Sequence, residues 1–65
     1  MTPAEFRELR HKLGLNQTQL AAVMGYGSAG QSRISELEGG ETVPAKAERL
    51  MQAYVSGYRP SDWPD

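Results

Sequence analysis

The sequence predicts an all-α fold, a compact bundle of four to five helices. Apolar residues recur at three- and four-residue spacing in four separate stretches, and no stretch shows the two-residue alternation of a strand. Helix-start signals or glycines separate these stretches. The chain has 65 residues, which is enough for one domain with a small core.

The first predicted helix begins after Thr2. Thr2 can cap the helix, Pro3 suits its first position, and Glu5 can reach back to close a capping box. Gly14 stands where a left-handed residue ends a helix. The apolar stripe of this helix consists of Phe6, Leu9 and Leu13.

The second predicted helix begins at Asn16, with Gln19 three residues further on to complete a second capping box. Gly25 ends it after about eight residues, a length that needs neighbouring helices for stability. Ala21 is small enough to let another helix approach closely. The inward face consists of Leu20, Ala21, Val23 and Met24.

The third predicted helix begins at Ser28, which together with Gln31 forms a third capping signal. Ile34 and Leu37 give it one apolar face, and Gly39 follows as a stop. This pattern favours a helix from about residue 29 to residue 38.

The fourth predicted helix begins near Pro44 and ends at Gly57. Residues 1–57 therefore form the predicted domain, and residues 58–65, with two prolines and one tryptophan, form an irregular C-terminal tail. The apolar stripe of the fourth helix consists of Ala47, Leu50, Met51 and Tyr54.

Composition excludes several classes of function. The chain has no cysteine, which excludes disulfides and thiolate metal sites and favours the cytoplasm. No segment has the length and apolarity of a signal peptide or a membrane span. His11 is the only histidine, and no serine has the partners that activate a nucleophile. We therefore expect no enzyme activity, no cofactor, no metal and no membrane partner.

Charge is distributed unevenly although the net charge is −1. Residues 1–35 hold four basic and two acidic residues, whereas residues 36–65 hold three basic and six acidic ones. This asymmetry is consistent with a basic working face or with an ordinary solvated surface.

Two short helices joined by a glycine-containing turn form the helix-turn-helix arrangement, whose second helix enters the major groove of DNA. The segments LGLNQTQLAAVMG and SRISELEGG resemble the DNA-binding domain of the Cro/C1-type (XRE) family of phage and bacterial repressors. The resemblance covers residues 5–54 and implies a lambda-repressor-like domain. It rests on Leu15, Gln17, Leu20, Ala21, Gly25, Ile34, Ser35, Leu37, Glu38 and Gly40.

The sequence departs from this family between the two middle helices. The family usually has six residues from the turn glycine to the isoleucine of the recognition helix, whereas Ile34 follows Gly25 by nine. The three additional residues, close to one helical turn, lengthen either the turn or the front of the recognition helix. The Ser28 capping signal favours the second alternative, and Gly30 inside the helix weighs against it.

The resemblance implies which residues bind DNA. Gln17 corresponds to the residue that contacts the DNA backbone and often a second side chain. Asn16 is a structural cap, a phosphate contact or both. Amide, arginine and carboxylate groups on the recognition helix suit adenine, guanine and cytosine respectively. The residues implied on and before this helix are Ser28, Gln31, Ser32, Arg33, Ser35 and Glu36.

The same resemblance implies a structural ion pair between Arg10 and Glu38, which would orient the first and third helices. His11 is expected to face solvent or a phosphate.

The end of the fourth helix and the tail have no assigned partner within the domain. Aromatic residues are enriched at the centres of interfaces, so we expect a homodimer contact here. Alternatively, Trp63 folds back onto the core of its own chain. The residues of the expected dimer contact are Tyr54, Val55, Tyr58 and Trp63.

These expectations favour a sequence-specific regulator, a dimeric repressor of phage or mobile-element type that binds a double-stranded DNA operator without a small-molecule effector. The alternative is an antitoxin that binds a protein toxin and regulates its own operon. A protein-binding module without DNA binding is the third possibility.

Overall fold

Four α-helices and one 3₁₀ turn make up the fold. The computed structural model describes residues 1–40 and 42–64, and at Ser28 the backbone only. The all-α prediction is confirmed, since no strand occurs in these residues. The elements are α1 (Pro3–Lys12), α2 (Gln17–Met24), the 3₁₀ turn η1 (Gly27–Ala29), α3 (Gly30–Glu38) and α4 (Ala45–Val55).

Local capping fixes the start of α1 as the sequence predicts. The Glu5 amide donates to Thr2 Oγ1 at 3.1 Å, and the Thr2 amide donates to Glu5 Oε1 at 2.9 Å. The bond from the Thr2 backbone is the main reason that the pKa of Glu5 lies below its ordinary value. The capping box therefore favours the ionised form of Glu5 at the positive end of the helix dipole.

The second capping box is also confirmed. The Gln19 amide donates to Asn16 Oδ1 at 2.7 Å, and the Asn16 amide donates to Gln19 Oε1 at 2.9 Å. Gly25 ends α2 in the left-handed conformation, with φ of 82°. The capping box and Gly25 therefore define the two ends of the short helix α2.

The segment between α2 and α3 contains a 3₁₀ turn that the sequence did not predict. Gly27, with φ of 76°, begins the turn η1, and α3 begins only at Gly30. Ala29 occupies the N-cap position without a side-chain bond. The predicted capping signal of Ser28 depends on a side chain that lies outside the described residues. The turn runs directly into α3, and the bounds of α3 agree with the predicted helix of about residues 29–38 to within one residue.

A close approach of α2 and α3 explains Gly30. A Cβ atom placed on this residue would lie 2.5 Å from the Cβ of Ala21 and 2.8 Å from the Cβ of Tyr26. Gly30 is therefore required by the packing of α3 against α2 and Tyr26. The small side chain of Ala21 permits the close approach of another helix that the sequence predicts.

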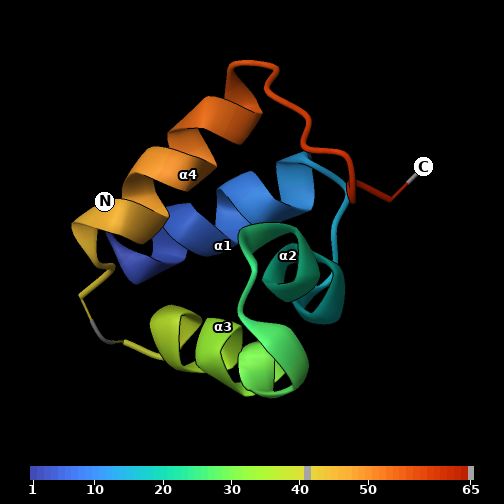
Figure 1. Ribbon diagram of the computed structural model, residues 1–65. Helices are drawn as coiled ribbons and strands as arrows, with labels where there is room; N and C mark the ends of the chain where they lie inside the picture. The colour runs from blue at the N-terminus through green and yellow to red at the C-terminus, as the bar shows by residue number, and fades with distance from the viewer. Residues whose placement is uncertain (41, 65) are drawn as a thin grey trace.

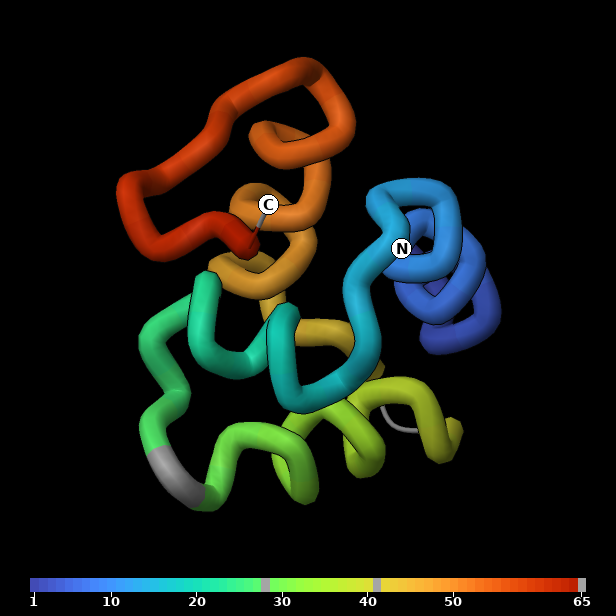
Figure 2. Tube along the Cα trace, turned by 90° about the vertical axis from the view of Figure 1, so that its right-hand side faces the viewer, coloured from blue at the N-terminus to red at the C-terminus, as the bar shows by residue number. Residues whose placement is uncertain are grey.

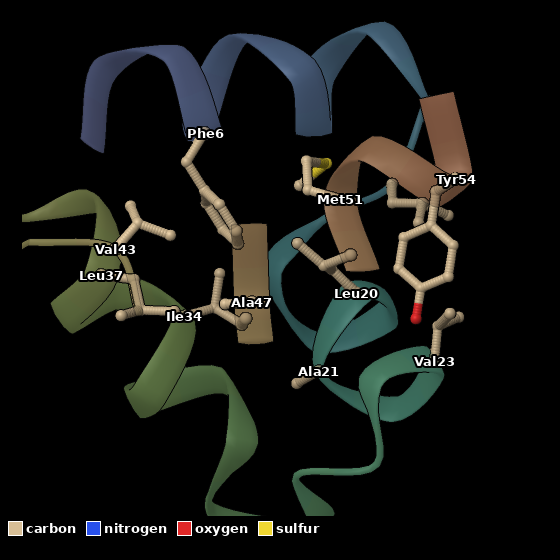
Figure 3. Close-up of a cluster of buried hydrophobic side chains, with 11 residues drawn as sticks. Phe6, Leu20, Ala21, Val23, Ile34, Leu37, Val43, Ala47, Met51 and Tyr54 are labelled. Atoms are coloured by element: carbon tan, nitrogen blue, oxygen red, sulfur yellow. The ribbon is translucent and has the colours of Figure 1, made fainter. Parts of the chain in front are cut away.

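One hydrophobic core joins the four helices (Figure 3). The helices α3 and α4 lie on opposite sides of the molecule, with α1 and α2 between them (Figures 1 and 2). The radius of gyration is 10.6 Å, close to the roughly 11 Å expected for a compact chain of this length. The core consists of Phe6, Leu15, Leu20, Ala21, Val23, Ile34, Leu37, Val43, Ala47, Met51 and Tyr54.

The tail folds back over the end of α4, where two of the four expected dimer residues, Tyr54 and Trp63, contact each other within one chain. Tyr54 is only 1% exposed and points toward Val23, so it belongs to the core (Figure 3). This burial raises the pKa of Tyr54 above its ordinary value. Trp63 packs edge-on against Tyr54 with 5.3 Å between the ring centroids, as in the alternative prediction.

Candidate nucleic-acid interface

The helix α3 divides its residues between the core and the surface. Ile34 and Leu37 are buried, because they lie three residues apart on one face of the helix. All five residues of α3 proposed to contact DNA are exposed: Gln31, Ser32, Arg33, Ser35 and Glu36. The packing of α3 therefore leaves a polar surface along the whole helix.

This polar surface has two rows. Gln31, Ser35 and Glu38 follow one another at helical spacing along the edge of α3 that borders Gln17 of α2. We call this the inner row. The outer row consists of Ser32, Arg33 and Glu36.

The outer row contains one ion pair. Arg33 Nη1 lies 3.5 Å from Glu36 Oε1, and both side chains are about half exposed. An exposed pair of this kind contributes little stability, so either side chain can exchange its partner for a base edge at small cost.

Behind the inner row, the structure brings Arg10 and Glu38 together. Arg10 Nε donates to Glu38 Oε2 at 2.6 Å, and Arg10 Nη2 donates to Glu38 Oε1 at 3.1 Å. Arg10 Nη1 donates to the Leu15 carbonyl at 2.9 Å. Since Arg10 is only 7% exposed, this bidentate pair fixes α1, the start of α2 and the end of α3 relative to one another.

Gln17 extends this pair to the surface of α3. Gln17 Nε2 donates to Glu38 Oε1 at 3.3 Å, and Gln17 Oε1 accepts from Gln31 Nε2 at 2.7 Å. A continuous series of hydrogen bonds thus runs from the buried Arg10 to the exposed Gln31. Its effect is to orient the Gln31 amide on the polar surface of α3.

Asn16 and His11 lie beside this network. The side chain of Asn16 caps α2 while remaining exposed. The His11 ring is exposed, and its Nε2 lies 3.1 Å from Arg10 Nη2. The side chain of Ser28 lies outside the described part of the structure.

Sequence reasoning assigned no individual role to Arg7. This exposed residue lies on α1, one turn before Arg10, and lines a hollow together with Gln17 and Ser35. The sequence does contain a signal for Arg7. It precedes Arg10 by three residues, and residues three apart on a helix share a face.

Comparison with known proteins places the chain in a family. A model of the helix-turn-helix domain family matches residues 4–57. No curated protein sequence and no solved structure matches the chain. In the described residues no helix has the length and apolarity to cross a bilayer.

The match covers α2, α3 and α4 completely and α1 except for its first residue. Domains of this family bind DNA and are typically not enzymes. The chain therefore belongs to the helix-turn-helix domain family, of the kind found in XRE-type regulators, and is a DNA-binding regulator.

Proposed function

We propose that this regulator is a sequence-specific repressor of phage or mobile-element type that binds a double-stranded operator as a homodimer. The observation that carries the proposal is the fixed orientation of Gln31 on α3. An oriented polar group on an exposed recognition helix is what direct reading of base edges requires.

Gln31 is the proposed reader of adenine. One hydrogen of its Nε2 is bound by Gln17, which leaves the second hydrogen and the Oε1 acceptor. These two groups match the N7 acceptor and the N6 donor that adenine presents in the major groove. Gln17 is proposed to contact the DNA backbone. Through its hydrogen bond with Gln31 it also fixes the position of the Gln31 amide.

The outer row is proposed to read the neighbouring base pairs. Arg33 suits guanine, Glu36 suits the amino group of cytosine, and Ser32 suits either partner of a pair. Ser28 is proposed to contact DNA because the turn η1 precedes α3 directly. Asn16 is proposed to bring the capped start of α2 against a phosphate.

The tail favours a regulator over the antitoxin alternative. Antitoxins of this kind usually wrap their toxin with an extended or disordered segment. The described tail residues instead pack on the domain itself, through Trp63 on Tyr54.

Selection of bound duplexes from a random DNA pool tests the proposal. We expect enrichment of one half-site, which is repeated with a fixed spacing. Gln31→Ala and Arg33→Ala should each lose roughly 1–3 kcal/mol of binding free energy, concentrated at particular base pairs. Gln17→Ala should weaken binding to all sequences, because Gln17 is proposed to contact the backbone, and should in addition lower discrimination at the base pair read by Gln31, whose amide it orients.

The binding free energies are measured by titration of wild-type protein and variants against the selected duplex and its single-base variants. If no sequence is enriched, sequence-specific binding is wrong. If Gln31→Ala and Arg33→Ala both bind like wild type, the roles of the recognition helix are wrong even though DNA is bound.

A further inference from the structure

His11 is the single histidine of the chain, and its ring contacts the buried ion pair behind α3. Its Nε2 lies 3.1 Å from Arg10 Nη2, although the ring itself is exposed. A guanidinium has five N–H donors and no acceptor, so Arg10 is the donor in this hydrogen bond. His11 Nε2 is therefore the acceptor, and the ring is the neutral tautomer that carries its proton on Nδ1.

This bond completes the hydrogen bonding of Arg10. Its Nε and Nη2 donate to the two carboxylate oxygens of Glu38, and its Nη1 donates to the Leu15 carbonyl. The second hydrogen of Nη2 is directed to His11. Histidine is the residue type that changes its charge between about pH 5 and pH 8, so His11 is the partner of Arg10 that responds to pH in this range.

Protonation of the ring reverses this contact. An imidazolium has no lone pair to offer, and its positive charge faces that of Arg10. The new N–H also competes for Glu38 Oε1, because this oxygen and His11 Nε2 are both bonded to Arg10 Nη2, each at 3.1 Å. Glu38 Oε1 is the same atom that accepts from Gln17. Protonation of His11 therefore weakens the bond that fixes Gln17, and through it the position of Gln31.

The other charged groups around the ring leave this effect in place. The open groove that the ring lines also contains Arg7 and Glu8 of α1 and Glu38 of α3, and the two glycines that follow α3 carry no charge. Arg7 disfavours a positive charge on the ring, whereas Glu8 favours it, so their effects oppose each other. Glu38 is therefore the carboxylate whose hydrogen bonds change with the charge of the ring.

We propose that His11 is a positioning residue of the DNA-reading surface, and that its neutral form is required for full discrimination at the base pair read by Gln31. This inference rests on the proposed reading of DNA through α3 and adds a dependence on pH. The neutral ring predominates above the range in which histidine titrates. Discrimination is therefore complete there and falls as the pH drops through this range.

The measurement must separate discrimination from overall affinity. A positive charge on an exposed ring also attracts phosphates, so the affinity for all DNA rises when the ring is protonated. The ratio of the affinities for two duplexes of equal charge removes that contribution. The two duplexes are the selected duplex and the same duplex changed at the base pair read by Gln31.

Titration of both duplexes between about pH 5 and pH 8 tests the proposal. For wild type, we expect the ratio of the two affinities to fall by roughly 2- to 10-fold from the upper to the lower pH, the size expected for loss of one hydrogen bond. A protein whose discrimination does not depend on the charge of the ring should keep the same ratio throughout.

Three variants separate the charge of the ring from its other properties. His11→Gln offers an amide oxygen to Arg10 and does not titrate, so discrimination should stay high at every pH. His11→Lys is charged throughout and cannot accept, so discrimination should be low at every pH. The matched control combines His11→Gln with Lys12→His. It moves the histidine by one residue to another exposed position of α1, and its discrimination should not depend on pH.

Nuclear magnetic resonance of the imidazole nitrogens tests the contact without DNA. Because the chain has one histidine, its ring signals are identified directly. We expect the proton on Nδ1 at about pH 8, where the ring is neutral. A proton on Nε2 would mean that Arg10 does not donate to the ring, and the proposal would then be wrong.

The outcomes separate this inference from the proposed function. If the wild type selects no DNA sequence, both fail. If the wild type keeps the same discrimination throughout the pH range, or if His11→Lys discriminates like wild type at the upper pH, His11 is not a positioning residue and the function stands. The same holds if the control variant shows the pH dependence of wild type. Circular dichroism at each pH establishes that each variant is folded.

Discussion

At the scale of the residue, one buried ion pair supports the functional surface. Arg10 and Glu38 have side chains that are 9% and 6% exposed. Desolvation of both charges makes such a pair a weak source of net stability, although loss of one partner is costly. Its value here is orientation, since Gln17 and through it Gln31 depend on the position of Glu38.

Substitution of one partner or both separates these two roles. Arg10→Met leaves the buried carboxylate without its charge partner and should lower the free energy of unfolding by roughly 3–5 kcal/mol. The double variant Arg10→Met with Glu38→Leu should recover most of that loss, because two apolar side chains replace the pair. Urea unfolding followed by circular dichroism measures both values.

The recovered stability should not restore DNA binding. Without Glu38, Gln17 loses one of its two partners, and discrimination at the base pair read by Gln31 should fall. A double variant that discriminates bases like wild type would show that the pair has no role in orientation.

At the scale of the element, the sequence predicts local features better than tertiary contacts. The capping boxes at Thr2 and Asn16 each lie within four consecutive residues, so sequence alone indicates both. The need for glycine at position 30 reflects instead a contact with Ala21, nine residues away in the sequence. The predicted start near residue 29 lies within one residue of the observed start at Gly30, whereas the turn η1 before it was not predicted.

Gly30→Ala tests this contact. In an isolated helix, alanine is favoured over glycine by about 1 kcal/mol. Here the added Cβ would lie 2.5 Å from the Cβ of Ala21, so α2 and α3 must separate. We expect a net loss of roughly 1–3 kcal/mol in the free energy of unfolding, measured by urea unfolding.

The companion variant moves the methyl group to the other helix. In Gly30→Ala with Ala21→Gly, the clash with residue 21 is removed while that with Tyr26 remains. Stability should therefore be partly recovered relative to the sum of the single variants. Strict additivity would mean that the two residues do not meet.

At the scale of the whole molecule, the tail completes the domain. Arg59 lies over the Trp63 ring, 4.2 Å from its centroid, and donates to the Tyr54 carbonyl at 2.6 Å. Tyr54 shares the predicted apolar stripe of α4 with Ala47, although the sequence also placed it among the expected dimer residues. The return of Trp63 could not be predicted with the same certainty, because prolines and an irregular backbone carry no periodic pattern. The DNA-binding surface could likewise be predicted only in part. The helix-turn-helix motif identifies α3, but the hollow beside Arg7 is lined by residues of three helices.

The size of the domain also bears on the proposed dimer. The greatest extent of one copy is 29 Å, which is shorter than the separation of about 34–36 Å between successive major-groove faces. One copy therefore reaches one half-site. With Tyr54 and Trp63 packed within the chain, the proposed dimer contact reduces to Val55 and Tyr58, which are 42% and 58% exposed.

Val55→Asp tests this smaller contact, with Trp63→Ala as the matched comparison. Val55 is exposed, so the Val55→Asp chain should stay folded by circular dichroism while the variant converts a wild-type dimer to a monomer in sedimentation at micromolar concentration. It should also abolish cooperative binding to a duplex with two half-sites, because the two copies no longer contact each other. Trp63→Ala removes the edge-on contact with Tyr54 and the cation–π contact with Arg59. It should therefore lower the free energy of unfolding by roughly 1–2 kcal/mol. If wild type sediments as a monomer both with and without DNA, the homodimer proposal fails, whereas dissociation of the dimer by Trp63→Ala without loss of stability would return Trp63 to the interface.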